Sequence, residues 1–162
     1  MVKLWDRLWD GSARGYIQMG RSAVKLKFAH LADYAGVDSG GKLTIVGLFG
    51  AVFDAMKVRP IPFPQFHIVG VFEAKLTEGT DHQVQVQLID QQTRTVLRKF
   101  DGAIRFSPMG RGQPLQAPML LGFGPNVITV PQHGTYEFRF LIDGKDVGGI
   151  PVSVSDPPQP PE

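Results

Sequence analysis

The sequence predicts an all-β domain built as an antiparallel sandwich of about seven or eight strands. Eight short stretches within residues 24–155 are apolar or alternate between apolar and polar residues. The chain has 19 Gly and 13 Pro among 162 residues, which is typical of many turns rather than long helices. Two long connections, residues 50–64 and 107–118, suit crossings between two sheets and favour a sandwich over a barrel.

The domain opens with two predicted strands. In residues 24–28, Val24, Leu26 and Phe28 fall on one side and two lysines on the other, the alternation of a half-buried strand. Residues 43–49, Leu-Thr-Ile-Val-Gly-Leu-Phe, are apolar on both sides. Because strands covered on both faces have this composition, we expect residues 43–49 to be central in a sheet.

Four strands follow in the middle of the chain. Residues 66–76 form the third, and residues 82–90 alternate most regularly. The side chains expected on one face of these two strands are Phe66, Ile68, Phe72 and Leu76, and then Val84, Val86 and Leu88. Three glutamines face outwards: Gln83, Gln85 and Gln87. We expect the fifth strand over residues 95–106, broken at the Asp-Gly pair 101–102, and the sixth within residues 119–130.

The last two strands are the most aromatic and aliphatic. Their inner faces are predicted to carry Tyr136, Phe138, Phe140 and Ile142, and then Ile150, Val152 and Val154. Tyr136 starts its strand two residues before Phe138, as in the tyrosine corner of immunoglobulin-like sandwiches, where the hydroxyl bonds to upstream backbone. Phe138 takes the place of the usual buried cysteine. The alternative is an ordinary cross-strand aromatic. The pattern therefore favours an immunoglobulin-like topology.

The connections have the composition of turns. Residues 37–41 are predicted to join two paired strands, with glycines for positive φ and Asp38 for local capping. Residues 77–81 and 143–146 are predicted hairpin-type turns. In residues 50–58 we expect a helical turn or a crossover. No phosphate-binding loop is expected after residue 41, because the sequence that follows is strand-like rather than a helix N-terminus.

Two tails flank the domain predicted for residues 24–155. Residues 1–23 are an N-terminal extension, either a short amphipathic helix or disordered, in which Leu4, Trp5, Leu8 and Trp9 would make one apolar stripe. Such a stripe folds back on its own domain or docks onto a partner or a membrane surface. Residues 156–162 are a Pro-rich tail that we expect to be disordered and solvated.

The charge, the lack of cysteine and the lengths of the apolar runs make several kinds of function unlikely. The net charge is +2, and the basic residues are scattered rather than concentrated on one segment, so we expect no nucleic-acid binding. The chain has no cysteine, which excludes disulfides, thiolate nucleophiles and Cys-ligated metals. No run approaches the ~18 apolar residues of a membrane span. No signal peptide is visible, and we expect a cytoplasmic protein.

No catalytic or metal-binding motif stands out. No serine lies in a G-x-S-x-G turn, and the four histidines, His30, His67, His82 and His133, are not spaced as metal ligands. The acidic residues lie in turns, as turn chemistry alone requires. Asp143 and Asp146 with Asp38 or Asp81 form a weak calcium alternative at a sandwich end. We therefore predict no catalytic, cofactor or metal residues and no cofactor.

One segment resembles a known family. Ala32-Asp33-Tyr34-Ala35, followed by Gly41-Lys42-Leu43 and by Ile45-x-Gly47-x-Phe49, is similar to the opening of an uncharacterised bacterial family of small β-sandwich proteins, a domain of unknown function. The resemblance covers most of residues 24–155 and is generic towards the end. It implies a small β-sandwich and supplies no catalytic residues. The two tails depart from the family pattern.

These observations predict a non-enzymatic module that binds another protein or a second copy of itself, through an edge strand for example. The candidate interaction residues are Trp5, Trp9, Asp33, Tyr34 and Arg111. The Asp33-Tyr34 pair is predicted to be a packed polar latch, with a binding rim as the alternative. The alternative functions are a carbohydrate- or small-ligand-binding sandwich and a hydrolase with a dispersed site.

Overall fold

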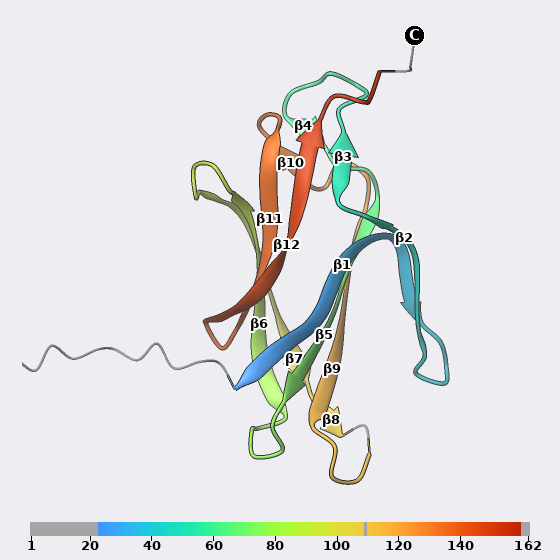
Figure 1. Ribbon diagram of the computed structural model, residues 1–162, viewed down its shortest axis with the longest axis vertical. Helices are drawn as coiled ribbons and strands as arrows, with labels where there is room; N and C mark the ends of the chain where they lie inside the picture. Colours follow the sequence, from blue (N-terminus) through green and yellow to red (C-terminus); the bar gives the residue numbers. More distant parts are fainter. Residues whose placement is uncertain (1–22, 109, 160–162) are drawn as a thin grey trace, which may run out of the picture.

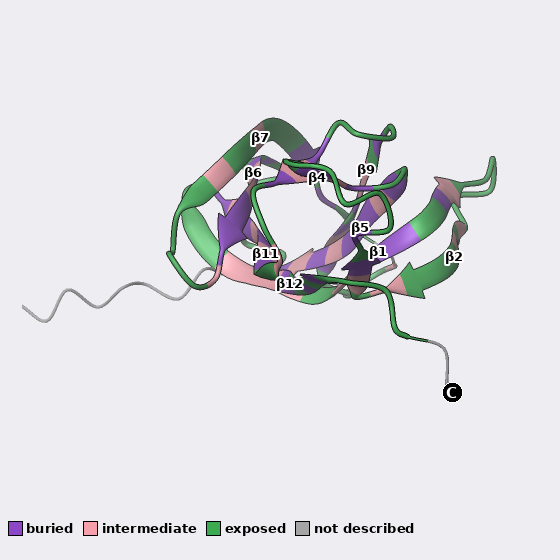
Figure 2. Cartoon of the chain, turned by 90° about the horizontal axis from the view of Figure 1, so that it is seen from above, coloured by how far each residue is buried: buried purple, intermediate pink, exposed green. Residues whose placement is uncertain are grey.

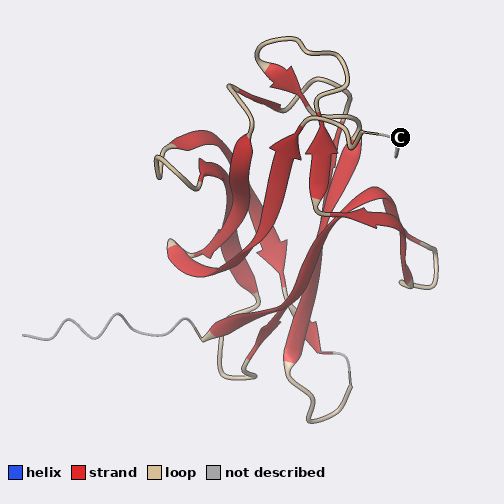
Figure 3. Ribbon diagram, turned by 45° about the horizontal axis from the view of Figure 1, so that its top comes forward, coloured by secondary structure: helices blue, strands red, loops and turns tan. Residues whose placement is uncertain are grey.

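A computed structural model describes residues 23–108 and 110–159, and in these ranges the protein is all strand and loop, with no helix (Figure 3). The first sheet has five strands, in the order β2 (Leu43–Phe49), β1 (Val24–Val37), β5 (Phe66–Ala74), β9 (Leu115–Phe123) and β8 (Ser107–Pro108). The second has five strands, in the order β3 (Ala51–Phe53), β12 (Lys145–Ser155), β11 (Gly134–Ile142), β6 (Asp81–Asp90) and β7 (Val96–Arg105). A short third sheet pairs β10 (Thr129–Val130) with β4 (Ile61–Pro62) (Figure 1).

The two five-stranded sheets share one apolar core. The side chains predicted to face inwards on β6, β11 and β12 are buried in this core, which confirms the predicted inner faces of these three strands. Aromatic rings join the sheets: Phe66 of the first packs on Phe138 of the second, and Phe72 on Phe140, each at 5.7 Å between ring centroids. Each such phenylalanine contributes roughly 2–3 kcal/mol by leaving water. The core therefore holds the two sheets face to face.

The tyrosine-corner contact predicted for β11 is present. The Tyr136 ring is buried, and its hydroxyl donates a hydrogen bond to the backbone carbonyl of Gln132 at 2.7 Å. Burial raises the pKa of the Tyr136 phenol, so the hydroxyl keeps its proton and remains a donor. Phe138, two residues on, is fully buried. The contact ties the start of β11 to the loop that leads into it.

Two turns also form as predicted. Asp38 caps the β1–β2 turn by accepting hydrogen bonds from the backbone amides of Gly40 and Lys42, both at 2.9 Å, and Gly41 has φ +79°. In the β11–β12 hairpin, Asp143 and Gly144 have φ 49° and 78°, the paired positive values of a type I′ turn. Short polar turn sequences with glycine are sufficient to predict both.

The prediction for the first strand was wrong beyond Leu26. A β-bulge between Leu26 and Phe28 adds one residue to β1 relative to β5. An extra residue reverses which face the following side chains point to. Phe28 is therefore 37% exposed, while Leu31 is fully buried in the core.

The prediction that residues 43–49 form a central strand was also wrong. β2 is the outermost strand of the first sheet and pairs only with β1 among the described residues. After Phe49 the chain leaves for β3 in the second sheet, pairing Ala51 with Ser153. An apolar composition on both faces therefore does not reflect burial here, and Figure 2 shows β2 largely exposed.

Several strand and turn boundaries differ from the predicted ones because the chain crosses between the two sheets. Residues 77–81 connect β5 to β6 and so cross between the sheets instead of closing a hairpin. Leu76 lies in this crossing and is exposed, although it was predicted to share the face of Phe72. Residues 50–58 form the predicted crossover rather than a helical turn, since they hold β3 and a bend and take the chain from the first sheet to the second. The sixth long strand is β9, which begins earlier than the predicted 119–130.

The predicted break in β7 is absent. Gly102 stays in register with Val84 of β6, so the strand runs continuously through the Asp-Gly pair. Partner β6 satisfies the backbone of β7 on both sides of the glycine, and this tertiary pairing outweighs the local turn preference of the dipeptide.

We expect Tyr136→Phe to lower the free energy of unfolding by about 1 kcal/mol, because the substitution removes the hydrogen bond to Gln132 and keeps the buried ring. Urea denaturation monitored by far-UV circular dichroism measures this change. The matched control is Tyr34→Phe, which alters an exposed ring and should leave the unfolding free energy unchanged. Equal effects of the two substitutions would contradict a stabilising corner.

Candidate functional site

The β1–β2 ribbon is the part of the first sheet that extends past its neighbours. The register of β1 with β5 ends at the pair Ala32–His67, whereas β1 continues to Val37. Beyond Ala32, β1 pairs with no described strand other than β2, so the two strands project from the sandwich as a two-stranded ribbon (Figure 1). We call β2 and residues 33–37 the β1–β2 ribbon.

One face of this ribbon carries three exposed apolar side chains. Val46 and Leu48 alternate on β2, and Tyr34 lies directly opposite Val46 on β1, so the three share a face. Their exposed fractions are 55% for Val46, 58% for Leu48 and 55% for Tyr34. A single exposed side chain of this kind is common, whereas three adjacent ones make a candidate contact surface. We call Tyr34, Val46 and Leu48 the ribbon patch.

Local contacts fix the Tyr34 ring in this patch. The ring meets His67 edge to face at 5.7 Å between centroids. On its other side the ring lies over Gly36, where a Cβ would come within 3.2 Å of the Tyr34 Cζ atom. Glycine at position 36 therefore leaves the space that the ring uses, and the patch is a preformed surface.

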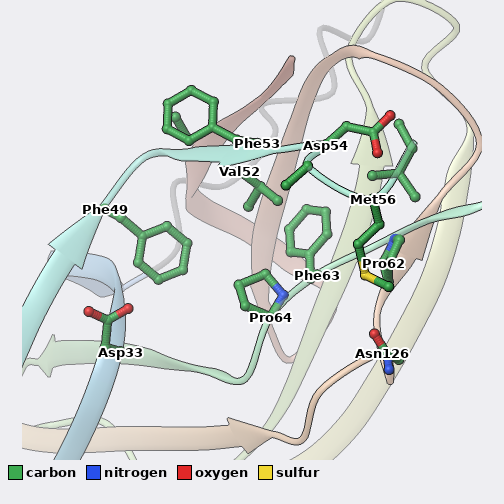
Figure 4. A pocket seen from close by; sticks show the side chains of 13 residues that line it. Asp33, Phe49, Val52, Phe53, Asp54, Met56, Pro62, Phe63, Pro64 and Asn126 are labelled. Atoms are coloured by element: carbon green, nitrogen blue, oxygen red, sulfur yellow. The ribbon is translucent and has the colours of Figure 1, made fainter. Parts of the chain in front are cut away.

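A cavity of about 400 Å³ opens between the ribbon and β3 (Figure 4). Its walls are mainly apolar and include Phe49, Val52 and Phe63. Phe53 and Met56 line it as well and are 51% and 71% exposed. The cavity thus joins an apolar interior to exposed apolar side chains.

Three polar residues also line the cavity: Asp33, Asp54 and Asn126. Asp33 is exposed, and its carboxylate accepts no hydrogen bond from any described residue. The backbone carbonyl of Asp33 instead accepts a hydrogen bond from His67 Nδ1 at 3.2 Å. The side chain of Asp33 lies at the rim of the cavity and packs against Gly47 of β2, and the latch role of the Asp33-Tyr34 pair stays a prediction.

The structure separates the predicted interaction residues. Asp33 and Tyr34 are neighbours that point to opposite faces of β1, one to the cavity and one to the ribbon patch. Arg111 is exposed in the loop between β8 and β9, at the far edge of the first sheet from β2. Trp5 and Trp9 lie outside the described residues.

Sequence reasoning missed the contributions of β2 and the segment after it. Val46, Leu48, Phe53 and Met56 were not singled out as interaction residues. The available signal was the lack of any charged residue in 43–49, which is equally the signature of a buried strand. Only the position of β2 at an edge distinguishes the two interpretations.

A buried histidine joins two loops at the far end of the second sheet. His82 Nδ1 lies 2.6 Å from Asp143 Oδ2, and His82 Nε2 lies 2.8 Å from the carbonyl oxygen of Gly79. Burial disfavours the charged ring, but the hydrogen bonds to Asp143 and Gly79 outweigh it and raise the pKa of His82. The same His82 hydrogen bond lowers the pKa of Asp143. With both ring nitrogens donating, His82 fastens residues 77–81 to the β11–β12 turn.

A second ionic cluster surrounds the buried carboxylate of Asp54. Asp54 accepts hydrogen bonds from Arg59 Nη1 at 2.6 Å, from His133 Nε2 at 3.1 Å and from the Lys57 amide at 2.8 Å. Burial raises the pKa of Asp54, but these hydrogen bonds outweigh that effect and keep the pKa below its usual value. The cluster closes the loop that follows β3.

Asp54, His133 and Asp156 are also the described residues whose donor atoms could hold a metal ion, since these atoms lie within 4.8 Å of one another. The Arg59 guanidinium already bonds to the Asp54 carboxylate, so a cation would have to displace it. The acidic residues weighed for calcium do not gather: Asp38 caps its own turn, and Asp81 pairs with Arg105 at 2.7 Å. Asp38, Asp54 and Asp81 thus each bond to a neighbouring group of the described chain.

In comparisons with known proteins, the chain matches one family model and resembles two solved structures weakly. A family model described as a family of unknown function (DUF6941) matches residues 27–155. No curated protein matches the chain. The alkylpurine DNA glycosylase AlkC of Pseudomonas fluorescens, bound to DNA containing an abasic site analog, is 9% identical with a TM-score of 0.43, over 82% of this chain and 30% of that one. A β-glucosidase of Listeria innocua in complex with isofagomine is 10% identical with a TM-score of 0.40, over 79% of this chain and 16% of that one.

The chain thus spans less than a third of either solved structure, and likenesses this weak say nothing about function. Within the described ranges, no helix has the length and hydropathy to cross a membrane.

We expect His82→Gln to destabilise the protein most in mildly acidic solution. The pKa of His82 is raised on folding, so its contribution is complete below the unfolded value of 6.5 and is lost as the pH rises through the folded value. The contribution of Asp143, whose pKa is lowered from 3.8, is lost as the pH falls through its folded value. The difference in Tm between wild type and variant should therefore shrink above about pH 6.5.

Thermal unfolding followed from about pH 4 to about pH 9, a range that brackets the ordinary pKa of histidine, measures this difference. His30→Gln is the matched control, since it removes an exposed histidine from the other sheet. A Tm difference for His82→Gln that grows with pH would contradict the charged latch.

Proposed function

The chain belongs to DUF6941, a family of unknown function, and we propose that it is a non-enzymatic module that binds another protein through the ribbon patch. The observation that carries the proposal is an edge strand, β2, with no charged residue and with Val46 and Leu48 exposed beside Tyr34. Natural edge strands are usually protected by charges, prolines or bulges, because their free backbone groups pair with other strands. β2 has seven residues and carries neither a charge nor a proline, and its one irregularity is Gly47 with φ 69°, so this edge is suited to being covered.

Strand addition is the binding mode that this geometry supports. A partner strand beside β2 would hydrogen-bond to its outer backbone groups, while alternate side chains would meet the ribbon patch. Burying the patch would contribute about 25 cal/mol for each Å² of apolar surface removed from water. Since the three side chains of the patch are apolar, the partner we propose is a protein and not a nucleic acid.

The contacts of the ionisable groups support a non-enzymatic role. Two histidines do approach carboxylates, His82 near Asp143 and His133 near Asp54, which is the arrangement that a hydrolase with a dispersed site would need. A general base needs a ring nitrogen free to accept a proton. His82 has none free, because its two ring nitrogens are hydrogen-bonded to Asp143 and to the carbonyl of Gly79.

We also assign the sandwich to the immunoglobulin-like class and the protein to the cytoplasm. The class rests on the Tyr136 corner and on β2 and β3, which pass from one sheet to the other at one edge. The location rests on the absence of cysteine from the chain.

We expect Val46→Lys to abolish partner binding without unfolding the protein, because it places a charge in the middle of an apolar edge that the partner must cover. Tagged protein expressed in the native host, followed by quantitative mass spectrometry of co-purifying chains, measures the loss. Val96→Lys is the matched control, an exposed valine on β7 at the edge of the other sheet. Partner recovery that falls equally with both substitutions, or with neither, would overturn the proposal.

A second candidate function is supported by the cavity beside β3. Its apolar walls, the exposed ring of Phe53 and the unpaired carboxylate of Asp33 suit a small carbohydrate or metabolite with one apolar face. The cavity is smaller than many drug-sized sites, at about 400 Å³, so a mono- or disaccharide is the matching size.

For this second function we expect Phe53→Ala to lower ligand affinity at least tenfold, about 1.4 kcal/mol, by removing an apolar wall. Glycan-array binding followed by isothermal titration with the best hit measures the affinity. Val46→Lys is the control here, since the ribbon patch lies on the other face of the ribbon. A silent array would remove this function and leave the protein-binding proposal unaffected.

A further inference from the structure

We propose that the occupant of the β2 edge is a second copy of this chain, paired antiparallel with β2 about a twofold axis through Val46. This inference rests on the proposed function, in which the ribbon patch is a protein-binding surface. The result would be one continuous sheet running through β1 and β2 of both copies.

The four edges of the two five-stranded sheets show why β2 is singled out. β8 has two residues and ends in Pro108, and β3 has three residues. β7 is long but carries Arg98, Lys99, Asp101 and Arg105. Short strands, proline and charges are the usual protections of an edge. Of these four edges, β2 alone is long and uncharged.

The charges near β2 are compatible with a second copy of the chain as the partner. In a twofold-related antiparallel pair, the residues nearest the axis meet their own mates, and like charges directly opposite each other are destabilising. β2 brings no charge to the axis. The first charged residue before the strand, Lys42, would lie opposite Gly50 of the second copy and not opposite another lysine. The edge is therefore complementary to itself.

The side-chain alternation fixes the position of the axis. Residues directly opposite in an antiparallel pair point to the same face, so the axis must pass through a residue and not between two residues. An axis at Val46 pairs all seven residues of β2, whereas an axis at Ile45 or Gly47 leaves two of the seven beyond the end of the partner strand. At the Val46 axis, Thr44 meets Leu48, and Leu43 meets Phe49.

This register also brings the two ribbon patches together. Val46 of each copy lies on the axis, with Leu48 two residues away and Tyr34 one strand behind. Neighbouring strands lie about 4.8 Å apart, so the six side chains form one apolar surface that spans the axis. Each patch is thereby extended by its symmetry mate on the same side of the sheet.

The absence of cysteine from the chain permits a direct test with single-cysteine variants. Directly opposite residues in antiparallel strands have Cα atoms about 4.5–5.5 Å apart, which is within the range of a disulfide. We expect Val46→Cys to give a covalent dimer under mild oxidation by glutathione disulfide, visible on a non-reducing gel and reversed by dithiothreitol. The dimer should form at least tenfold faster than with Val96→Cys.

Leu48→Cys controls the register. Across the proposed axis, position 48 lies opposite Thr44, and the two copies of position 48 are about 14 Å apart, four residues along the strands. Leu48→Cys alone should therefore not cross-link, while the double substitution Thr44→Cys, Leu48→Cys should. Cross-linking of Leu48→Cys with none of Val46→Cys would overturn the axis at Val46.

Sedimentation equilibrium completes the test on the unmodified protein. We expect wild type and Val96→Lys to be dimeric, and Val46→Lys to be monomeric with an unchanged circular dichroism spectrum. A monomeric wild type without cross-linking of Val46→Cys would refute the second copy. If the wild type were monomeric but Val46→Lys still abolished the capture of a different protein, protein binding through the ribbon patch would stand and only the second copy would be wrong. If Val46→Lys changed no interaction at all, the proposed function and the dimer would both be wrong.

Discussion

The early end of the β1–β5 pairing is the constraint from which the ribbon patch and the cavity beside it follow. β5 accompanies β1 only as far as Ala32, yet β1 runs on to Val37 with β2 beside it. Two strands without a third neighbour cannot bury both of their faces, so the ribbon exposes apolar side chains that a wider sheet would cover. The chain then passes through Gly50 to the second sheet, and this crossing opens the cavity next to the ribbon (Figure 4).

Two clusters of ionisable side chains in the described chain hold loops in place. His82 with Asp143, and Asp54 with Arg59 and His133, resemble the pairs from which acid–base catalysts are built. Each cluster joins a connection between strands to its neighbour, and at His82 the hydrogen bonds occupy both ring nitrogens. In a sandwich without disulfides, such contacts order the loops at the two ends.

The ribbon places two potential binding surfaces back to back. Asp33 faces the cavity and Tyr34 faces the ribbon patch, because adjacent residues of a strand point in opposite directions. The segment that resembles the family signature, residues 32–49, lies almost entirely in β1, the turn and β2. A substitution at one face leaves the other chemically intact, which is why single variants can test the two proposed functions separately.

Local sequence is enough to predict the all-β class, the inner faces of β6, β11 and β12, the Tyr136 contact and the capped turn at Asp38, because each depends on alternation or on turn chemistry within a few residues. The other features depend on contacts between distant segments. The bulge before Phe28 and the edge position of β2 are set by which strand lies alongside, and local sequence carries no record of a missing neighbour. The ribbon patch and the cavity also depend on contacts between distant segments. Val46 and Leu48 have the composition of core residues, and they are exposed because nothing in the described chain packs over that face of the ribbon.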